Sequence, residues 1–190
     1  MPLRLDDHSL SGKLLIAMPG MRDPRFARSV IFLCAHNPEG AMGLVLNKIA
    51  GSIGFKELMK QLGIETDGLA EHRLVHFGGP VEPSRGFVLH TTDRMEESSM
   101  AVDDDIALTS TTDILKAIAI GAGPSRAMLA LGCASWGPGQ LDSELQQNAW
   151  LHAEADVELV FDRDLDAKWE RAIAKIGIRL EMLSAEAGHA

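Results

Sequence analysis

The chain has 190 residues, of which 46% are hydrophobic and 24% charged, and this balance is typical of a globular protein. Its 18 basic and 27 acidic residues give a net charge of −9, which argues against nucleic-acid binding because affinity there relies on a basic face. No apolar run is long enough to span a bilayer and no signal-peptide pattern is present, so we expect a cytoplasmic protein that does not contact membranes.

The first half of the chain predicts a series of strands with one helix among them. Apolar runs rich in β-branched residues predict strands at 13–18, 29–35 and 41–48, and the last two flank a turn that contains Asn37 and Gly40. Helical spacing of apolar residues predicts a helix over 54–62, with Ser52 as a cap. Further strands are predicted at 73–77, 86–91, 98–102 and 106–109, with a loop at 66–71.

The second half mixes helices with strands. Ser110 to Asp113 fit a capping box that opens a helix, and the apolar run 127–134 predicts a buried strand. A helix over 140–148, a strand over 157–161 and a final helix that ends at Gly177 follow. The pattern predicts an α+β fold with a largely antiparallel sheet and three to four flanking helices. We expect a single domain over 1–190, or two lobes that share one core, with tails at 1–12 and 180–190.

The cysteines and the familiar motifs point away from cofactor chemistry. Cys34 and Cys133 lie in separate apolar runs, which predicts reduced, buried thiols without a disulfide, and leaves the reactivity of Cys133 open. Zinc-ligand spacing, a Walker loop, a dinucleotide fingerprint and a His-Glu-x-x-His motif are all missing from the sequence. We therefore expect no metal and no cofactor, and we assign no catalytic residue.

The junction between the strand 127–134 and the following helix is the best candidate for a site. A strand-to-helix turn exposes backbone N–H groups over a cleft. Here the turn holds Trp136 and a Gly-Pro-Gly sequence. The segment Gly132-Cys133-Ala134-Ser135 has one residue too many before its serine to match the hydrolase elbow Gly-x-Ser-x-Gly.

We hypothesise that this junction meets the hairpin loop at 37–43 and forms a shared binding site. Asparagine, glutamine and glutamate side chains would supply polar contacts, glycines would let a backbone approach closely, and the indole would form an apolar wall. The candidate binding residues are Asn37, Gly40, Gly43, Asn47, Ser135, Trp136, Gln140 and Glu144. The alternative is that the glycines only form turns, the polar row is a solvated helix face and the tryptophan packs in the core.

Histidines offer a second set of candidates. His36, His76 and His90 lie in or next to predicted strands, where each is either a base or ligand or, more commonly, a side chain satisfied within the fold. His72 and His76 are four residues apart, but their strand-like run disfavours a helical metal pair.

Several blocks of sequence together resemble one family. The blocks are Leu15-Ile16-Ala17-Met18-Pro19, Asp23-Pro24-x-Phe26, His36-Asn37-x-x-Gly40-Ala41-Met42-Gly43, Gly78-Gly79-Pro80-Val81, Arg85-Gly86-Phe87 and Ser135-Trp136-x-x-Gly139-Gln140-Leu141. In order and spacing they are similar to the AlgH/YqgE family of bacterial proteins over nearly the whole chain. The resemblance implies an α+β fold whose branched sheet curls into a pseudo-barrel. Members of that family are often labelled transcriptional regulators.

Two functions therefore stay open. The first is a non-enzymatic regulatory or interaction protein that acts without direct DNA binding, because the chain is acidic. The second is a small-molecule binder or hydrolase that acts at the Trp136 junction. The partner is accordingly a protein or a small molecule of unknown identity, and the sequence leaves the oligomeric state open.

Overall fold

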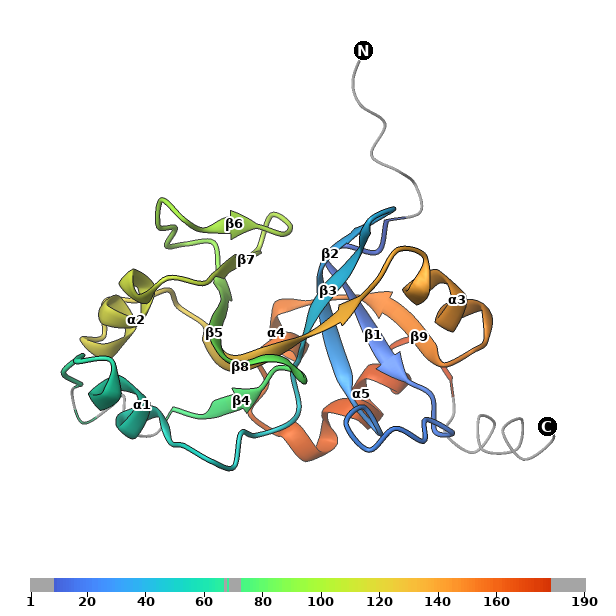
Figure 1. Cartoon of the computed structure of the whole chain (residues 1–190), viewed down its shortest axis with the longest axis horizontal. Coiled ribbons are helices and arrows are strands. Elements are labelled where there is room, and N and C mark those ends of the chain that lie inside the picture. Colours follow the sequence, from blue (N-terminus) through green and yellow to red (C-terminus); the bar gives the residue numbers. More distant parts are fainter. Residues whose placement is uncertain (1–8, 67, 69–72, 179–190) are drawn as a thin grey trace, which may run out of the picture.

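The structure is a computed structural model that describes residues 9–66, 68 and 73–178 (Figure 1). In this part of the chain the strands are β1 Lys13–Ala17, β2 Val30–Asn37, β3 Gly40–Val45, β4 Val75–Phe77, β5 Val81–Thr91, β6 Met100–Ala101, β7 Ile106–Thr109, β8 Ala127–Trp136 and β9 Trp150–Glu154. The helices are α1 Phe55–Gln61, α2 Thr112–Ala119, α3 Gln140–Gln146, α4 Val157–Val160 and α5 Leu165–Lys175. His72, the expected tail at 180–190 and most of the tail at 1–12 and of the loop at 66–71 lie outside the described residues.

The strands form one branched sheet, and β8 is the strand at which it branches. The order of neighbours is β6-β7-β5-β8-β3-β2-β1-β9. One edge of β8 pairs antiparallel with β5, whereas the other pairs first with β4, in parallel at Leu129, and then with β3, antiparallel at Ala134. The predicted α+β fold with a largely antiparallel sheet that branches and curls is therefore confirmed (Figure 1).

Glycines make the branch possible, because two backbones cross there almost in contact. Gly132 lies in the middle of β8 with φ of +74°, a conformation that glycine adopts without steric cost. A Cβ atom added to Gly132 would lie 2.3 Å from the carbonyl oxygen of Gly79, and one added to Gly79 would lie 2.1 Å from the carbonyl carbon of Cys133. The turn between β4 and β5 therefore crosses β8 where that strand bends.

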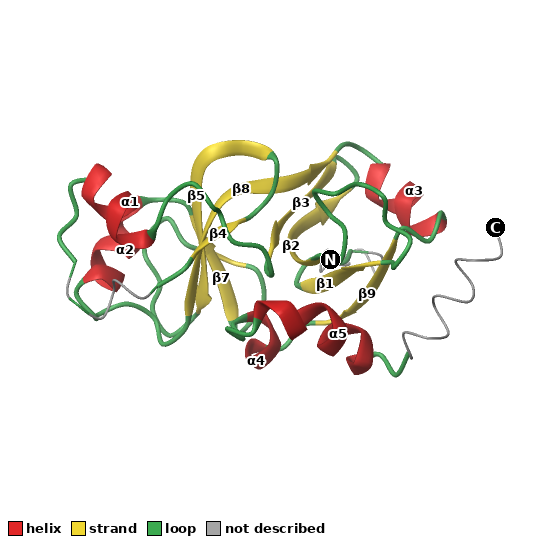
Figure 2. Cartoon of the chain, turned by 90° about the horizontal axis from the view of Figure 1, so that it is seen from below, coloured by secondary structure: helices red, strands yellow, loops and turns green. Residues whose placement is uncertain are grey.

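The core lies on both faces of the sheet. Leu14 and Ile16 of β1 belong to the cluster that includes Trp169 of α5, whereas Leu15 belongs to the opposite cluster, which includes Trp136. Burial on both faces explains why these strands are almost continuously apolar. The helices α1 and α2 pack against the sheet at the end of the molecule that also holds β4 (Figures 1 and 2). The helices α4 and α5 lie beneath the sheet (Figure 2).

One predicted strand is wrong. Residues 157–161 were expected to form the last strand, but they form the single-turn helix α4, which Asp156 caps by accepting a hydrogen bond from the backbone N–H of Leu159 at 2.7 Å. A short apolar run does not distinguish a strand from a buried helical turn. The last strand is instead β9, and α4 brings the described helices to five, more than the expected three to four.

The predicted helix caps also differ from the structure. The N-cap residues are Gly54 for α1 and Thr111 for α2, and neither makes a side-chain cap hydrogen bond. Both helices are anchored instead by their apolar faces, since Phe55, Met59, Ile114 and Ile118 are buried in a shared cluster.

Candidate functional site

The Trp136 junction is a closed aromatic cluster. Trp136 is 6% exposed, and its ring meets that of Trp150 edge-on with 6.1 Å between the centroids. Both indole Nε1–H groups donate to one oxygen, Oε1 of Glu144, at 3.4 Å and 3.1 Å. The carboxylate of Glu144 therefore satisfies two buried donors and fixes α3 against the ends of β8 and β9.

The hairpin loop and the junction lie side by side. Ala41 of β3 is the register partner of Trp136 in β8, and Gly40 lies against the carbonyl oxygen of Trp136, where a Cβ atom would come within 2.3 Å. Gly43 pairs with Ala134 two residues further on. The meeting of the two segments, which the shared-site hypothesis requires, is thus present in the structure.

The polar candidates at this meeting point support their own turns. Asn37 accepts a hydrogen bond from the backbone N–H of Glu39 at 2.8 Å, and Gln140 accepts one from that of Gly137 at 3.0 Å. Ser135 is exposed on β8, and the described residues give its hydroxyl no hydrogen-bond partner. These contacts stabilise loops, and they do not assemble a nucleophile with a base.

Asn47 is not brought to this site. It follows the opposite end of β3, where its Oδ1 accepts from the backbone N–H of Val30 at 2.9 Å. Its Nδ2 donates to the carbonyl of Arg28 at 2.8 Å. Asn47 therefore ties the end of the hairpin to the loop that precedes β2.

His36 and His90 both use their ring nitrogens within the fold. Nδ1 of His36 accepts from the backbone N–H of Leu10 at 3.0 Å, and Nε2 lies 3.2 Å from Oδ1 of Asp142. His90 is fully buried, with Nδ1 2.9 Å from the carbonyl of Thr91 and Nε2 2.7 Å from the hydroxyl of Thr109. Neither ring keeps a free nitrogen for catalysis.

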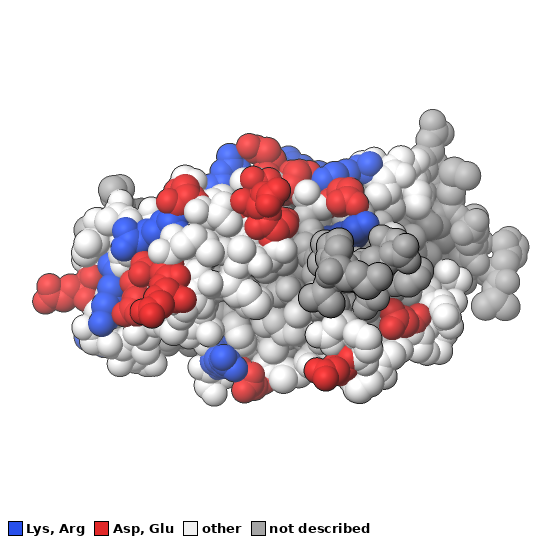
Figure 3. Space-filling model, turned by 90° about the horizontal axis from the view of Figure 1, so that it is seen from above, with Lys and Arg blue, Asp and Glu red and all other residues white. Residues whose placement is uncertain are grey.

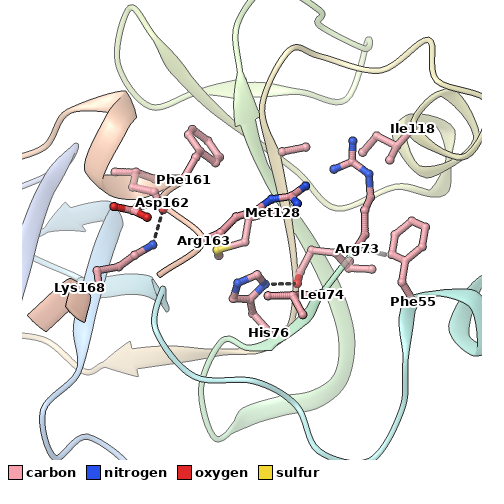
Figure 4. A pocket seen from close by; sticks show the side chains of 13 residues that line it. Phe55, Arg73, Leu74, His76, Ile118, Met128, Phe161, Asp162, Arg163 and Lys168 are labelled. Carbon is pink, nitrogen blue, oxygen red and sulfur yellow. Dashed lines mark hydrogen bonds between the residues drawn. The ribbon is translucent and has the colours of Figure 1, made fainter. Parts of the chain in front are cut away.

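A cavity of about 230 Å³ lies elsewhere, where α5 and the α4–α5 loop face β4, β8 and the ends of α1 and α2 (Figure 4). We call it the Lys168 cavity. Its apolar wall includes Phe55, Ile118, Met128 and Phe161. Its polar lining consists of Arg73, His76, Asp162, Arg163 and Lys168.

Lys168 is the unusual residue of this cavity. Its side chain is 1% exposed, and Nζ donates one hydrogen bond, to the carbonyl of Val160 at 2.8 Å. Burial lowers the pKa of Lys168 to about 8. An ammonium group has three donors, yet within the described part of the chain no carboxylate lies within ion-pair distance of Lys168. A cation is therefore buried without a counter-charge.

The neighbouring groups leave the cavity with an excess of positive charge. Burial and, to a lesser extent, the charge of Lys168 lower the pKa of His76 to about 4, so this imidazole is neutral at physiological pH. The carboxylate of Asp162 is paired with Arg171, outside the lining. Arg163 adds an exposed guanidinium group that makes no ion pair among the described residues.

Sequence reasoning considered His76 but missed Lys168 and the cavity. The position of Lys168 in the helical repeat could have revealed it. Lys168 lies on the same buried face of α5 as Trp169, Ala172 and Ile173. A lysine at a position where the pattern expects an apolar residue is uncommon. The cavity itself joins segments more than 100 residues apart, which periodicity cannot bring together.

Comparison with known proteins assigns the family. The model of the AlgH-like family matches residues 14–181, which is most of the chain. The chain belongs to the AlgH-like family. This confirms the resemblance seen in the sequence blocks.

Relatives of this AlgH-like protein are similar along nearly their full length. A UPF0301 protein of Afipia carboxidovorans is 57% identical over 189 residues, covering 95% of this chain and 90% of the relative. A UPF0301 protein of Rhodopseudomonas palustris strain HaA2 is 54% identical and covers 100% and 90%. The names of these two relatives state no activity, ligand or partner.

Two solved structures share the fold. The solution structure of AlgH from Pseudomonas aeruginosa superposes with a TM-score of 0.79 at 40% identity and covers 97% of both chains. The crystal structure of a Corynebacterium diphtheriae protein superposes with a TM-score of 0.73 at 21% identity, covers 91% of this chain and 90% of the other, and supports the fold alone.

Other features bear on the expected chemistry. Cys34 and Cys133 are free and buried, and burial raises the pKa of Cys34 to about 12 and also raises that of Cys133, which disfavours a reactive thiolate. Within the described ranges, none of the helices has the length and hydropathy of a membrane span. The same residues contain no group of three or more side chains suited to hold a metal ion.

Proposed function

We propose that this AlgH-like protein is a non-enzymatic regulatory protein that binds a small molecule in the Lys168 cavity. The observation that supports the proposal is the ammonium group of Lys168, buried at 1% exposure beside a cavity and without a carboxylate partner among the described residues. Burying an unpaired charge is costly, and a bound counter-charge would offset that cost.

A purely structural role accounts for only part of this arrangement. Lys168 does bind the carbonyl of Val160 at the end of α4, which is a normal way to satisfy a helix C-terminus. That contact uses one of three ammonium donors and supplies no negative charge. The remaining donors and the open volume beside them suit a ligand.

Regulation would operate through a protein or ligand contact and not through DNA. The net charge of −9 disfavours phosphate binding by the surface as a whole. The two buried free thiols suit a reducing compartment, so we infer a cytoplasmic location. This matches the regulatory label that members of the family often carry.

The Trp136 junction takes a structural role in this proposal. Glu144 is committed to two indole donors, and Gln140 and Asn37 to their own turns. The hydroxyl of Ser135 has no hydrogen-bond partner among the described residues, so no base activates it for hydrolysis, and the Lys168 cavity is the better site for a small molecule.

A thermal-shift screen against metabolites tests the proposal. A ligand selective for the folded state raises the melting temperature of the wild-type protein, and mass spectrometry should recover it unchanged if the protein does not turn it over. Lys168→Met should lose the shift, whereas the matched control Lys60→Met, on the exposed face of α1, should keep it. A panel that shifts wild type and Lys168→Met equally, or shifts neither, would overturn the proposal.

A further inference from the structure

We infer that the ligand of the Lys168 cavity is a small organic monocarboxylate, whose carboxylate meets Lys168 and whose apolar body lies toward Phe55 and Ile118. This inference rests on the proposed function and adds the chemical class of the ligand. Figure 4 shows the two ends: Lys168 stands on one side of the cavity, Phe55 and Ile118 on the other, and Met128 between them.

The charges in the wall select a single negative charge. Only one cation of the lining, Lys168, is fully buried, so one carboxylate is enough to neutralise it. Arg163 is exposed and remains hydrated, and it makes no ion pair among the described residues. A second negative charge, such as that of a phosphate monoester, would lose its hydration without a second buried cation to meet it.

The size and walls of the cavity describe the rest of the ligand. A volume of about 230 Å³ is the liquid volume of roughly eight water molecules at about 30 Å³ each. It therefore suits a ligand on the order of ten non-hydrogen atoms. Phe55, Ile118, Met128 and Phe161 form an apolar surface at which a hydrocarbon or aromatic body is favoured over a sugar or a second charged group.

Calorimetric titration of the full chain with matched probes tests the inference. Hexanoate supplies the charge and the body, hexanamide removes only the charge, and hexyl phosphate adds a second charge. We expect hexanoate to bind at least tenfold more tightly than hexanamide and than hexyl phosphate. Acetate, which lacks the body, and dodecanoate, which exceeds the volume, should both bind more weakly than hexanoate.

Variants locate the effect. In Lys168→Met the preference for hexanoate over hexanamide should disappear. Lys168→Gln keeps a hydrogen-bond donor but no charge, and it should lose the same preference. Circular dichroism and the melting temperature establish that both variants fold. Lys60→Met should retain the wild-type preference.

The outcomes separate this inference from the proposed function. Equal binding of hexanoate and hexanamide, or tighter binding of hexyl phosphate, would overturn the monocarboxylate assignment even if both bind in the cavity. The assignment also fails if no probe binds while the metabolite screen finds another ligand that depends on Lys168, and the proposed function then stands. If the screen finds no such ligand, the proposed function itself fails.

Discussion

Among single residues, Glu144 and Lys168 differ in how completely the fold uses their charge. Glu144 accepts hydrogen bonds from two buried indoles through one oxygen. Lys168 donates to one backbone carbonyl and has no ion-pair partner among the described side chains. A charge that the fold satisfies points to structure, whereas a buried charge left without a partner points to a ligand.

Glu144→Leu should destabilise the fold. The substitution leaves the Nε1–H groups of Trp136 and Trp150 without their acceptor, and an unsatisfied buried donor costs about 1–3 kcal/mol. We expect the free energy of unfolding to fall by about 2–3 kcal/mol, measured by urea denaturation with tryptophan fluorescence. Glu144→Gln keeps an acceptor and should lose about 1 kcal/mol or less. Equal stability of Glu144→Leu and wild type would contradict the structural role.

His76 should make stability depend on pH. Its folded pKa of about 4 lies below the ordinary value of 6.5, because burial disfavours the imidazolium. Between pH 6.5 and pH 4 the imidazole is protonated in the unfolded state but not in the folded state. The contribution of His76 to the free energy of unfolding is therefore fully present above pH 6.5 and is lost as the pH falls to 4. The loss is on the order of 3 kcal/mol.

Comparison with His76→Asn isolates this effect from the titration of other groups. The Asn side chain keeps a donor near the carbonyl of Leu129, which lies 3.3 Å from Nδ1 of His76, but it does not titrate. From pH 7 to pH 4 the unfolding free energy of the wild type should fall by more than that of His76→Asn. A constant difference over that range would show that the histidine titrates normally.

Among the elements, β8 has the position with the strictest steric requirements. It pairs with β5 on one edge and with β4 and β3 on the other, and it bends at Gly132 where the β4–β5 turn crosses it. The crossing requires that neither backbone carries a side chain at the point of contact.

Gly79→Ala should therefore disrupt the sheet. The added methyl group would lie 2.1 Å from backbone of Cys133, and the φ of +152° is itself unfavourable for alanine. We expect a loss of more than about 3 kcal/mol, or failure to fold, because backbone atoms cannot move aside like a flexible side chain. The control is Gly51→Ala, where nothing lies within 4 Å of the added atom. Similar melting temperatures for both variants would refute the close crossing.

The elements differ in how well their sequences predict them. The strands β1 and β2 and the helix α2 follow from apolar runs and helical spacing. The segment 157–161 was assigned to a strand because its four apolar residues fit either structure, and only packing beneath the sheet selects the helical turn α4. The sequence does not predict β9, because its partner strand β1 lies more than 130 residues away in the chain.

The candidate site shows the same limit. The meeting of the hairpin with the Trp136 junction was predicted from glycines and turns, and Ala41 does pair with Trp136. The structural role of Glu144 was not predicted, because this role depends on a hydrogen bond from Trp150, which lies on another strand. The Lys168 cavity brings α5 together with β4, and local patterns carry no information on that contact.

For the whole molecule, charge is the property that limits its partners. On the face shown in Figure 3, acidic side chains lie among the basic ones and do not leave a continuous basic stripe. With a net charge of −9, the protein should be repelled by a polyanion at long range.

We therefore expect no binding to double-stranded DNA at physiological salt. Fluorescence anisotropy of a labelled random duplex should stay flat up to high micromolar protein. A titration with micromolar affinity that weakens steeply on added salt would mean that a local basic surface outweighs the net charge.

The position of β8 also determines when the sheet can be completed during synthesis. The strands β3 and β5 both end before residue 92, but β8, which joins them, begins at Ala127. About 80 residues separate the end of β3 from that start, which is roughly 4–16 s of translation at about 5–20 residues per second. Until β8 emerges from the ribosome, β3 and β5 have unpaired edges, so the nascent chain passes through an interval in which it is open to association with other chains.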